Sequence, residues 1–324
     1  MSKKEDFKAA LEGREPPGAV PVWELEFHAW DQASSRHVVL GEEFLALSAA
    51  ERERALYTNA EVLLSVSEEM HFAGLTVPGT YWEIAPGVPA HYWLPGDARY
   101  RQIEVIQEMG AGDLLLVAGS GGVMSMPGAS TYLAFAYKLY DAPEEVDELA
   151  RDALSRGLET ARRLRDLGIE ALFTASDIAD NHGPWFNPEQ MKRYILPYLS
   201  EWAAQVKRMG CYAILHTDGE LTPCLEDIAH SGIHALQAID PVAGMDILVV
   251  KRQVGGRLCL CGNLDCGLLV SGSPEEVYAA ARDLLLGCKA GGGFVLGASN
   301  AVQPEVPIAN YRAMIDAWAA HGRT

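Results

Sequence analysis

Apolar residues gather in eight short runs along the chain, each bounded by turn-forming residues, and this pattern predicts eight strands. The runs lie at residues 20–27, 72–77, 114–117, 169–174, 211–215, 233–239, 257–261 and 294–296. Between most of these runs, and after the last one, apolar positions recur at helical spacing. That spacing predicts helices at residues 49–70, 100–109, 143–167, 188–209, 221–230, 245–254, 274–288 and 306–320.

Strands that alternate with helices imply a parallel sheet, and eight such units in 324 residues are typical of a (β/α)8 TIM barrel, an α/β fold. Residues 1–19 precede the first run, and we expect them to form an N-terminal helical extension that caps the barrel. A doubly wound open sheet is the alternative. No glycine-rich linker divides the chain, so we expect a single domain over residues 1–324.

The charge balance limits the classes of partner. The chain carries 44 acidic and 26 basic residues, a formal net charge of −18, and no basic block, which disfavours nucleic acid. No apolar stretch approaches the ~20 residues that span a bilayer, and no apolar segment follows the charged start of the chain. We therefore expect a cytoplasmic protein with no membrane partner.

The six cysteines lack the dense spacing of a disulfide scaffold, so we expect reduced thiols. Cys259 and Cys261 face the same way on a predicted strand, but zinc ribbons prefer two or more residues between ligands. Small buried apolar side chains are the better interpretation of this pair. Cys261 nevertheless stays a candidate metal ligand.

The segment His216-Thr217-Asp218-Gly219 follows the fifth predicted strand. Side chains alternate across a strand, so His216 and Asp218 can share a side, and Gly219 allows the backbone to turn or a ligand to approach closely. The pair fits half of a metal site, an acid–base pair or a histidine held by a carboxylate at a strand end. Barrel chemistry collects in the loops after the carboxyl ends of the strands, which favours a functional role.

The loop after the fourth predicted strand also carries reactive residues. Asp177 and Asp180 lie three residues apart, close enough for repulsion to raise the pKa of one carboxyl, and Asp177 lies nearer the strand. Asp180 is equally typical of a loop that caps a neighbouring helix. Further polar candidates in the loops after strands are Asn181, His182, Asn263 and Asn300.

The first predicted strand ends in alternating acidic and aromatic residues. Alternation predicts that one set points into the barrel mouth, namely Glu24, Glu26 and His28. A carboxylate buried there needs a partner or a proton. The set expected to point the other way is Trp23, Leu25 and Phe27.

Four segments occur in an order that carries a family resemblance. They are residues 177–188 with 194–198, His216-Thr217-Asp218-Gly219, Cys261-Gly262-Asn263-Leu264-Asp265, and residues 296–307 with Asn310-Tyr311. Their order resembles the uroporphyrinogen decarboxylase superfamily, a (β/α)8 family that also contains cobalamin-dependent methyltransferases. The likeness covers nearly the whole chain and implies the barrel fold.

Departures from the decarboxylases of this family narrow the activity. Those enzymes hold a substrate with eight carboxylates through arginines after the first strand, where this chain has Glu24 and Glu26. The family aspartate after the second strand finds no match, and the family histidine after the eighth aligns near Ser299. Acidic residues would repel such a substrate, so the resemblance does not imply porphyrinogen decarboxylation.

The corrinoid methyltransferases of the family bind zinc through a His-x-Cys pair and a later Cys, and so activate a thiol substrate. Here His216 keeps the first position, Asp218 stands at the second, and Ser299 or Asn300 stands at the third. Because two thiolates are lost, we do not expect a tight thiol-activating zinc site. A weaker zinc site of His216, Asp218 and a carboxylate or Cys261 stays open.

What remains resembles the branch that demethylates methoxylated compounds and passes the methyl group to the cobalt of a corrinoid (cobalamin) on a separate protein. A phenolate, whose conjugate acid has a pKa of about 10, leaves better when its oxygen is protonated or metal-bound. The candidate acids or metal ligands are His216, Asp218, Asp177 and Glu26.

The expected activity is therefore methyl transfer from a small methylated substrate, such as a methoxyarene, to a corrinoid protein. Aromatic residues more often fill barrel cores, but the loop positions of Trp23, Tyr81 and Trp82 make them candidates to hold the aromatic ring of a substrate. The full set of expected substrate contacts is Trp23, His28, Tyr81, Trp82, Asp180, Asn181, His182, Asn263 and Asn300. A lyase such as a decarboxylase of a small acid, and a binding barrel without catalysis, are the alternatives.

Overall fold

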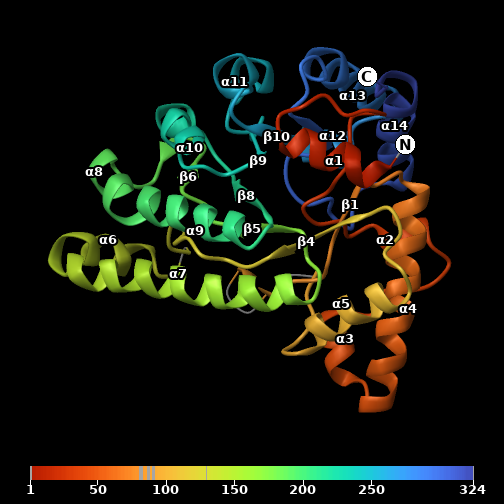
Figure 1. The fold of residues 1–324 in the computed structure, drawn as a ribbon, viewed down its shortest axis with the longest axis horizontal. Coiled ribbons are helices and arrows are strands. Elements are labelled where there is room, and N and C mark those ends of the chain that lie inside the picture. The colour runs from red at the N-terminus through yellow and green to blue at the C-terminus, as the bar shows by residue number, and fades with distance from the viewer. Residues whose placement is uncertain (1, 80–82, 86–87, 90–91, 129, 324) are drawn as a thin grey trace.

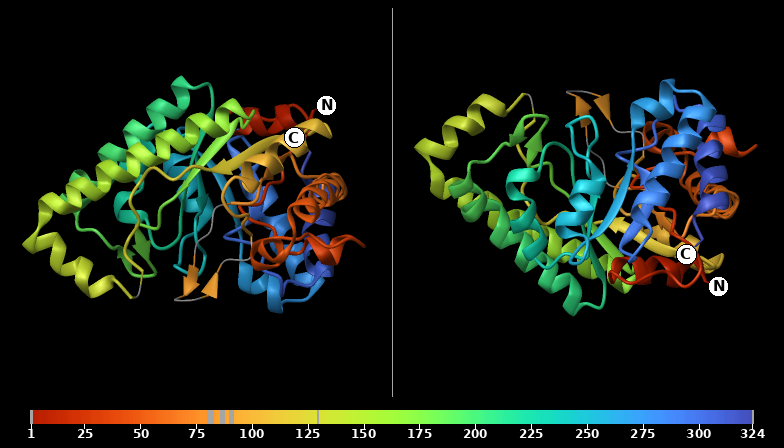
Figure 2. Two further views of the ribbon diagram at one scale, coloured as in Figure 1. Left: turned by 90° about the horizontal axis from the view of Figure 1, so that it is seen from below. Right: turned by 90° about the horizontal axis from the view of Figure 1, so that it is seen from above.

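The computed structural model describes residues 2–79, 83–85, 88–89, 92–128 and 130–323. Within them, a seven-stranded parallel sheet has the order β1, β4, β5, β8, β9, β10, β11. These strands are β1 (Gly74–Thr76), β4 (Leu115–Gly119), β5 (Ala171–Ala175), β8 (Tyr212–Thr217), β9 (Ala235–Ala238), β10 (Cys259–Leu264) and β11 (Phe294–Ala298). The sheet curls, and helices lie outside it (Figures 1 and 2), which confirms the predicted TIM-barrel class.

The predicted helices are present, with small shifts at their ends. Six of the matches are α4 (Ala49–Glu69), α5 (Ala98–Glu108), α7 (Pro143–Asp166), α11 (Ile247–Val254), α13 (Pro274–Cys288) and α14 (Ile308–His321). The helix predicted at residues 221–230 is a 3-10 turn, η2 (Thr222–Cys224), followed by α10 (Leu225–His230). Local sequence specifies the starts of α4 and α13, because Ser48 and Ser273 each form a capping box with a glutamate three residues on.

The helix predicted at residues 188–209 is interrupted. It consists of α8 (Pro188–Gln190), the π-helical turn η1 (Met191–Ile195) and α9 (Leu196–Arg208). Pro197 has no amide hydrogen to donate to the preceding turn, so a wider turn before it relieves the conflict.

Several short elements are not predicted by the hydrophobic pattern. They are α2 (Trp30–Ala33), α3 (Gly41–Ala46), α6 (Tyr132–Asp141), α12 (Cys266–Ser271), and the pairs β2 (Glu83–Ala85) with β3 (Val88–Pro89) and β6 (Ala179–Asp180) with β7 (Gly183–Pro184). Most are too short to show a period. The α6 helix lies at the end of the molecule farthest from α13 and α14 (Figures 1 and 2).

The N-terminal helix α1 (Lys3–Leu11) packs against the interior of the barrel. Ser2 caps it by accepting the amide hydrogen of Glu5. Phe7 and Leu11, one helical turn apart, join a buried cluster of inward-facing strand residues that includes Val117 and Ile214. Residues 1–19 thus contribute apolar side chains to the barrel core.

The predicted first strand, residues 20–27, closes the sheet without forming a regular strand. Val22 bridges to Phe72 just before β1 and to Leu296 of β11. The Trp23 amide donates to the Leu296 carbonyl at 3.0 Å, and the Ala73 amide donates to the Val22 carbonyl at 2.8 Å. The segment therefore pairs with both edges of the seven-stranded sheet.

At Glu24 side chains replace the backbone ladder, which resumes where Phe27 bridges to Val302. The Ala298 amide donates to Glu24 Oε2 at 2.9 Å, and Thr76 Oγ1 donates to the Glu24 carbonyl at 2.8 Å. A side chain on Gly297 would collide with the Trp23 carbonyl, since a Cβ there would lie 2.2 Å from that oxygen. The tight approach and the two side-chain bonds explain why the predicted strand is irregular.

Alternation along this segment was predicted wrongly for Trp23, Glu24 and Leu25, because Trp23 and Leu25 both belong to the interior cluster. Trp23 points into the barrel interior, where Nε1 donates to Thr76 Oγ1 at 2.9 Å. Glu24 points to α14, where the Tyr311 hydroxyl donates to Oε1 at 2.8 Å. Because the segment pairs with both edges of the sheet, its register determines which side chains face the barrel interior. Trp23 faces inward and Glu24 faces outward.

Burial of Glu24 raises the pKa of its carboxyl to about 8, although bonds from Ala298 and Tyr311 act in the other direction. The expectation that a buried carboxylate here needs a partner or a proton is met by both. The neighbouring titratable groups, Tyr311 and Cys266, also have pKa values raised by burial. The carboxyl is therefore protonated in the folded chain at neutral pH.

Glu24 should make stability depend on pH. Its folded pKa of about 8 exceeds the ordinary 4.5, so between these values the folded chain keeps a proton that the unfolded chain loses. The stabilisation is complete below about pH 4.5 and falls as the pH rises to about 8, by about 5 kcal/mol. Above that pH the loss levels off.

In urea unfolding from about pH 5 to about pH 9, we expect Glu24→Gln to remove this component of the slope. Glutamine keeps a donor for the Tyr311 oxygen and an acceptor for the Ala298 amide. Tyr311→Phe deletes a bond that lowers the Glu24 pKa, so it should extend the slope to higher pH. An equal slope in wild type and Glu24→Gln would contradict this account.

Candidate functional site

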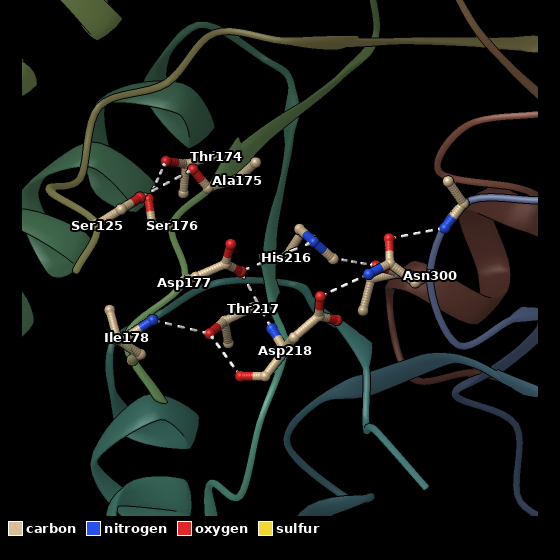
Figure 3. A network of polar contacts seen from close by, with 12 residues as sticks. Ser125, Thr174, Ala175, Ser176, Asp177, Ile178, His216, Thr217, Asp218 and Asn300 are labelled. Atoms are coloured by element: carbon tan, nitrogen blue, oxygen red, sulfur yellow. Dashed lines mark hydrogen bonds and ion pairs between the residues drawn. The ribbon is translucent and has the colours of Figure 1, made fainter. Parts of the chain in front are cut away.

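The candidate site forms where β5 and β8 end side by side. Ala175 and His216 are paired in the ladder, and the Ser176 amide donates to the His216 carbonyl at 2.9 Å. Beyond the strands, Thr217 Oγ1 accepts the Ile178 amide at 3.1 Å (Figure 3). These bonds place the loop of Asp177 against that of Asp218.

Asp177, His216 and Asp218 converge in these two loops. His216 Nε2 lies 3.9 Å from Asp177 Oδ1, which also accepts the Asp218 amide at 3.2 Å. One nitrogen or oxygen atom from each of the three side chains lies within 4.8 Å of the others. The predicted proximity of His216 and Asp218 is therefore found, and Asp177 joins them.

Gly219 lets the β8 loop approach its neighbour. Its φ is +93°, and a Cβ there would lie 2.7 Å from the Asp180 carbonyl oxygen. The next amide, that of Glu220, donates to the same oxygen at 2.8 Å. The tight turn expected at this glycine is present and sets the position of Asp218.

Two carboxamides contact the pair on β8. Gln237 Oε1 hydrogen bonds with His216 Nδ1, and Asn300 Nδ2 donates to Asp218 Oδ2. Asn300 Oδ1 in turn accepts the Ala301 amide at 2.7 Å, which fixes the direction of this carboxamide. Asn300 therefore contributes to the site by its hydrogen bond to Asp218.

Asp218 is the carboxylate most perturbed by its surroundings in this cluster. Burial raises its pKa to about 6, the charges of Asp177 and Asp240 add to the rise, and His216 and Asn300 oppose it. Its Oδ1 atom is buried and has no hydrogen-bond partner. An unpartnered buried carboxyl oxygen is costly, and it is suited to a bound proton, ligand or cation.

A cleft of about 420 Å³ opens over the cluster. The described residues that line it are Met126, Asp177, Ala179, Asp180, Asn181, His182, Asp218 and Gly219, with no lysine or arginine among them. Asp180 Oδ1 accepts the His182 amide at 2.7 Å, so this carboxylate also shapes its own loop. The predicted contacts Asp180, Asn181 and His182 thus lie at the cleft wall.

The donor set fits a divalent cation. It offers one imidazole nitrogen and two carboxylate oxygens, which suit zinc as well as harder metals such as manganese. The unpartnered Oδ1 of Asp218 supports this fit, since a cation would satisfy it. Cys261 is not in the set.

The expectation of Cys261 as a ligand is corrected by its position. Its thiol lies in the barrel interior, hydrogen bonds with Cys259, and has a pKa raised well above 9.0 by burial. Both cysteines are thus small buried side chains, as their spacing favoured, and all six cysteines are free thiols.

The prediction that Trp23 contacts the substrate also needs correction, because this side chain is 2% exposed and fills the barrel core. Glu26 and His28 form their own pair, with 3.0 Å between Oε2 and Nε2, outside the set around His216. Asn263 Nδ2 donates to the Ile239 carbonyl at 2.8 Å. Tyr81 and Trp82 lie outside the described residues.

Gln237 is the site residue that sequence reasoning missed. It stands inside the sixth predicted strand, between Leu236 and Ala238, and is 2% exposed. The available signal was a lone amide in an apolar run, because a buried carboxamide without partners is costly.

Comparison with solved structures finds a protein of the same fold. The methyltransferase from Methanosarcina mazei superposes over 99% of this chain and 99% of its own with a TM-score of 0.75, at 17% identity. At that identity the likeness concerns the fold. No described helix has the length and apolar character to cross a membrane.

Curated proteins named uroporphyrinogen decarboxylase match part of the chain. The uroporphyrinogen decarboxylase of Coxiella burnetii (strain RSA 493 / Nine Mile phase I) is 28% identical over 199 residues, 58% of this chain and 51% of that protein. That of Chlorobium phaeovibrioides is 27% identical over 152 residues, 46% and 42% of the two chains. The chain thus spans about half the length of the curated relatives it matches. The family described as uroporphyrinogen decarboxylase (URO-D) matches residues 116–321, more than half of the sequence, and the chain belongs to this family.

Proposed function

We propose that this protein is a methyltransferase that moves a methyl group from a small methylated substrate to the cobalt of a corrinoid carried by a partner protein. A methoxyarene is the substrate class that best suits an acid-assisted site. The chain supplies the substrate cleft and assistance to the leaving oxygen. The fold shared with the methyltransferase from Methanosarcina mazei supports the class of reaction.

The observation that carries this proposal is the unpartnered Oδ1 of Asp218, buried at the wall of the cleft beside Asp177 and His216. Family relatives that activate thiols have cysteine there. A carboxyl group instead exchanges protons or binds a cation at oxygen. The geometry therefore favours chemistry on an oxygen leaving group.

In the proposed step the bond between methyl carbon and substrate oxygen breaks, and its electron pair stays on the oxygen. The methyl group goes to the reduced cobalt, which supplies the electron pair of the new bond. Asp218 Oδ1 donates a proton to the leaving oxygen, which makes the product a neutral alcohol or phenol. The raised pKa of Asp218, about 6, leaves part of the population protonated near neutral pH.

Asp177, His216 and Asp218 are also the residues that would hold a divalent cation. Such a cation would supply Lewis-acid polarisation of the same oxygen. Glu26 lies outside this set and is paired with His28, so its role as an acid stays a prediction from the sequence. Asp180, Asn181 and His182 are proposed to contact the substrate from the cleft wall.

A decarboxylase is the second candidate, because the chain belongs to the URO-D family. The described cleft residues include no lysine or arginine to neutralise a carboxylate substrate, whereas three of them are aspartates. Methyl transfer is therefore the better interpretation. Release of carbon dioxide from a small acid without any corrinoid would reverse this preference.

The first prediction from the proposed function concerns turnover. Incubated with a panel of methoxyarenes and reduced cobalamin, or a corrinoid protein, the enzyme should form methylcobalamin, seen by its absorbance, and the demethylated phenol in equal amounts. Asp218→Asn should lower the rate on the order of 100-fold or more, because the amide can neither donate the proton nor ligate as a carboxylate. Asp227→Asn, on an exposed position of α10, serves as the control.

Loss of rate in Asp218→Asn with normal folding would support the proposal. No methyl transfer from any panel member to either acceptor, or full activity in Asp218→Asn, would contradict it. Activity without added corrinoid would contradict the proposed acceptor.

The second prediction concerns metal. In calorimetric titration of chelator-treated protein with Zn²⁺ or Co²⁺, the wild type should bind one ion per chain. Asp177→Asn, His216→Ala and Asp218→Asn should each weaken binding by roughly 100-fold. Asp180→Asn, which lines the same cleft outside the set, is the matched control. Equal binding by all variants would place the metal elsewhere.

A further inference from the structure

We infer that Gln237 is a positioning residue, whose carboxamide determines which nitrogen of His216 faces the cleft. The inference deepens the proposed function, on which it rests only for the role of His216. It follows from the contacts that surround one buried amide.

The hydrogen bonds of Gln237 leave one orientation for its amide. Gln237 Nε2 donates to the Ala298 carbonyl at 3.3 Å and to the Ser299 carbonyl at 3.4 Å. Carbonyl oxygens only accept, so a flipped amide would place its oxygen against two others and lose both bonds. Oε1 is therefore the atom that meets His216 Nδ1.

This orientation determines the tautomer of His216. An amide oxygen only accepts, so Nδ1 carries the hydrogen that it donates to Gln237. In the neutral imidazole, Nε2 then has the lone pair. Nε2 is the atom 3.9 Å from Asp177 Oδ1, so the lone pair is available to a cation or a substrate proton at the cleft.

The neighbouring backbone indicates that this placement is enforced. Ala238 and Ile239, which follow Gln237, have φ values of 104° and 53°, a region that side-chain-bearing residues rarely adopt. Such strained conformations collect at functional sites. Asn263 Nδ2 holds this turn through the Ile239 carbonyl, 2.8 Å away.

A purely structural role for Gln237 would consist of joining β9 to the end of β11. That role predicts a loss of stability on mutation and nothing specific at His216. A positioning role predicts a change in the protonated nitrogen of His216 and in the affinity for a cation. The tautomer therefore separates the two roles.

The experiment uses the full chain labelled with ¹³C and ¹⁵N at histidine, at a pH where the imidazole of His216 is neutral. His216→Gln identifies its signals among those of the nine histidines. In wild type we expect the Nδ1–H tautomer. Gln237→Met, similar in size but without the acceptor, should shift His216 to the Nε2–H form. Gln237→Glu keeps an acceptor for Nδ1, although it loses the donor to the Ala298 and Ser299 carbonyls, and should retain the wild-type tautomer.

A second measurement titrates the same proteins with Co²⁺ or Zn²⁺. Gln237→Met should weaken binding by roughly 10- to 100-fold, as removal of a partner behind a metal-binding histidine does, and Gln237→Glu should restore most of the affinity. Thermal unfolding identifies a variant that does not fold. In that case the wild-type tautomer and the Gln237→Glu protein still decide the outcome.

An Nε2–H tautomer in wild type overturns the inference, as does a folded Gln237→Met protein with unchanged tautomer and unchanged metal affinity. Failure of the proposed function is distinguishable. A protein that transfers no methyl group yet has the Nδ1–H tautomer retains the positioning role of Gln237 and loses only the proposed reaction.

Discussion

The closure of the sheet by residues 21–24 is the constraint on which the rest of the structure depends. The seven-stranded sheet would otherwise leave unpaired backbone groups on β1 and β11, and Val22 pairs with residues at both edges. At Glu24 the main-chain ladder is interrupted, and the Glu24 side chain accepts the amide hydrogen of Ala298 before main-chain pairing resumes between residues 26–28 and Val302. A protonated, fully buried carboxyl group thus completes the barrel wall.

Closure brings the carboxyl ends of the parallel strands to one end of the barrel, and the candidate site uses that convergence. The β5 and β8 ladder aligns Ala175 with His216, and the β8 and β9 ladder aligns His216 with Gln237. Asp177 and Asp218 follow the first two of these strands directly. Strand register therefore brings His216 and Gln237 together, and hydrogen bonds between the loops beyond the strands place Asp177 beside Asp218.

Much of this arrangement could be predicted from the sequence, because it depends on the spacing of apolar residues and on the position of polar residues after the predicted strands. Apolar runs located seven strands and the major helices, and the place of His216 and Asp218 after the fifth run located the cluster. The predictions that fail involve side chains replacing backbone groups. Alternation cannot foresee that Glu24 completes a ladder while Trp23 fills the barrel, since both depend on pairing with strands about 50 and 270 residues away. Cys261 failed as a ligand for a related reason, because strand register places its thiol in the interior cluster.

The closure and the candidate site are joined by hydrogen bonds. Tyr311 donates to Glu24, Glu24 accepts from the Ala298 amide, the Ala298 carbonyl accepts from Gln237, and Gln237 accepts from His216. The Ala298 amide can only donate and the Ala298 carbonyl can only accept, and these fixed roles set the direction of Gln237 and, through it, of His216. The carboxyl end of β11 therefore helps to position both Glu24 and Gln237. The same segment anchors Asn300 and, through it, Asp218 Oδ2. His216 Nε2 and Asp218 Oδ1 are not held by this series of hydrogen bonds, and they converge with Asp177 at the cleft. A site for proton or cation chemistry requires this arrangement, in which some atoms of a side chain hold its position and others are available to react.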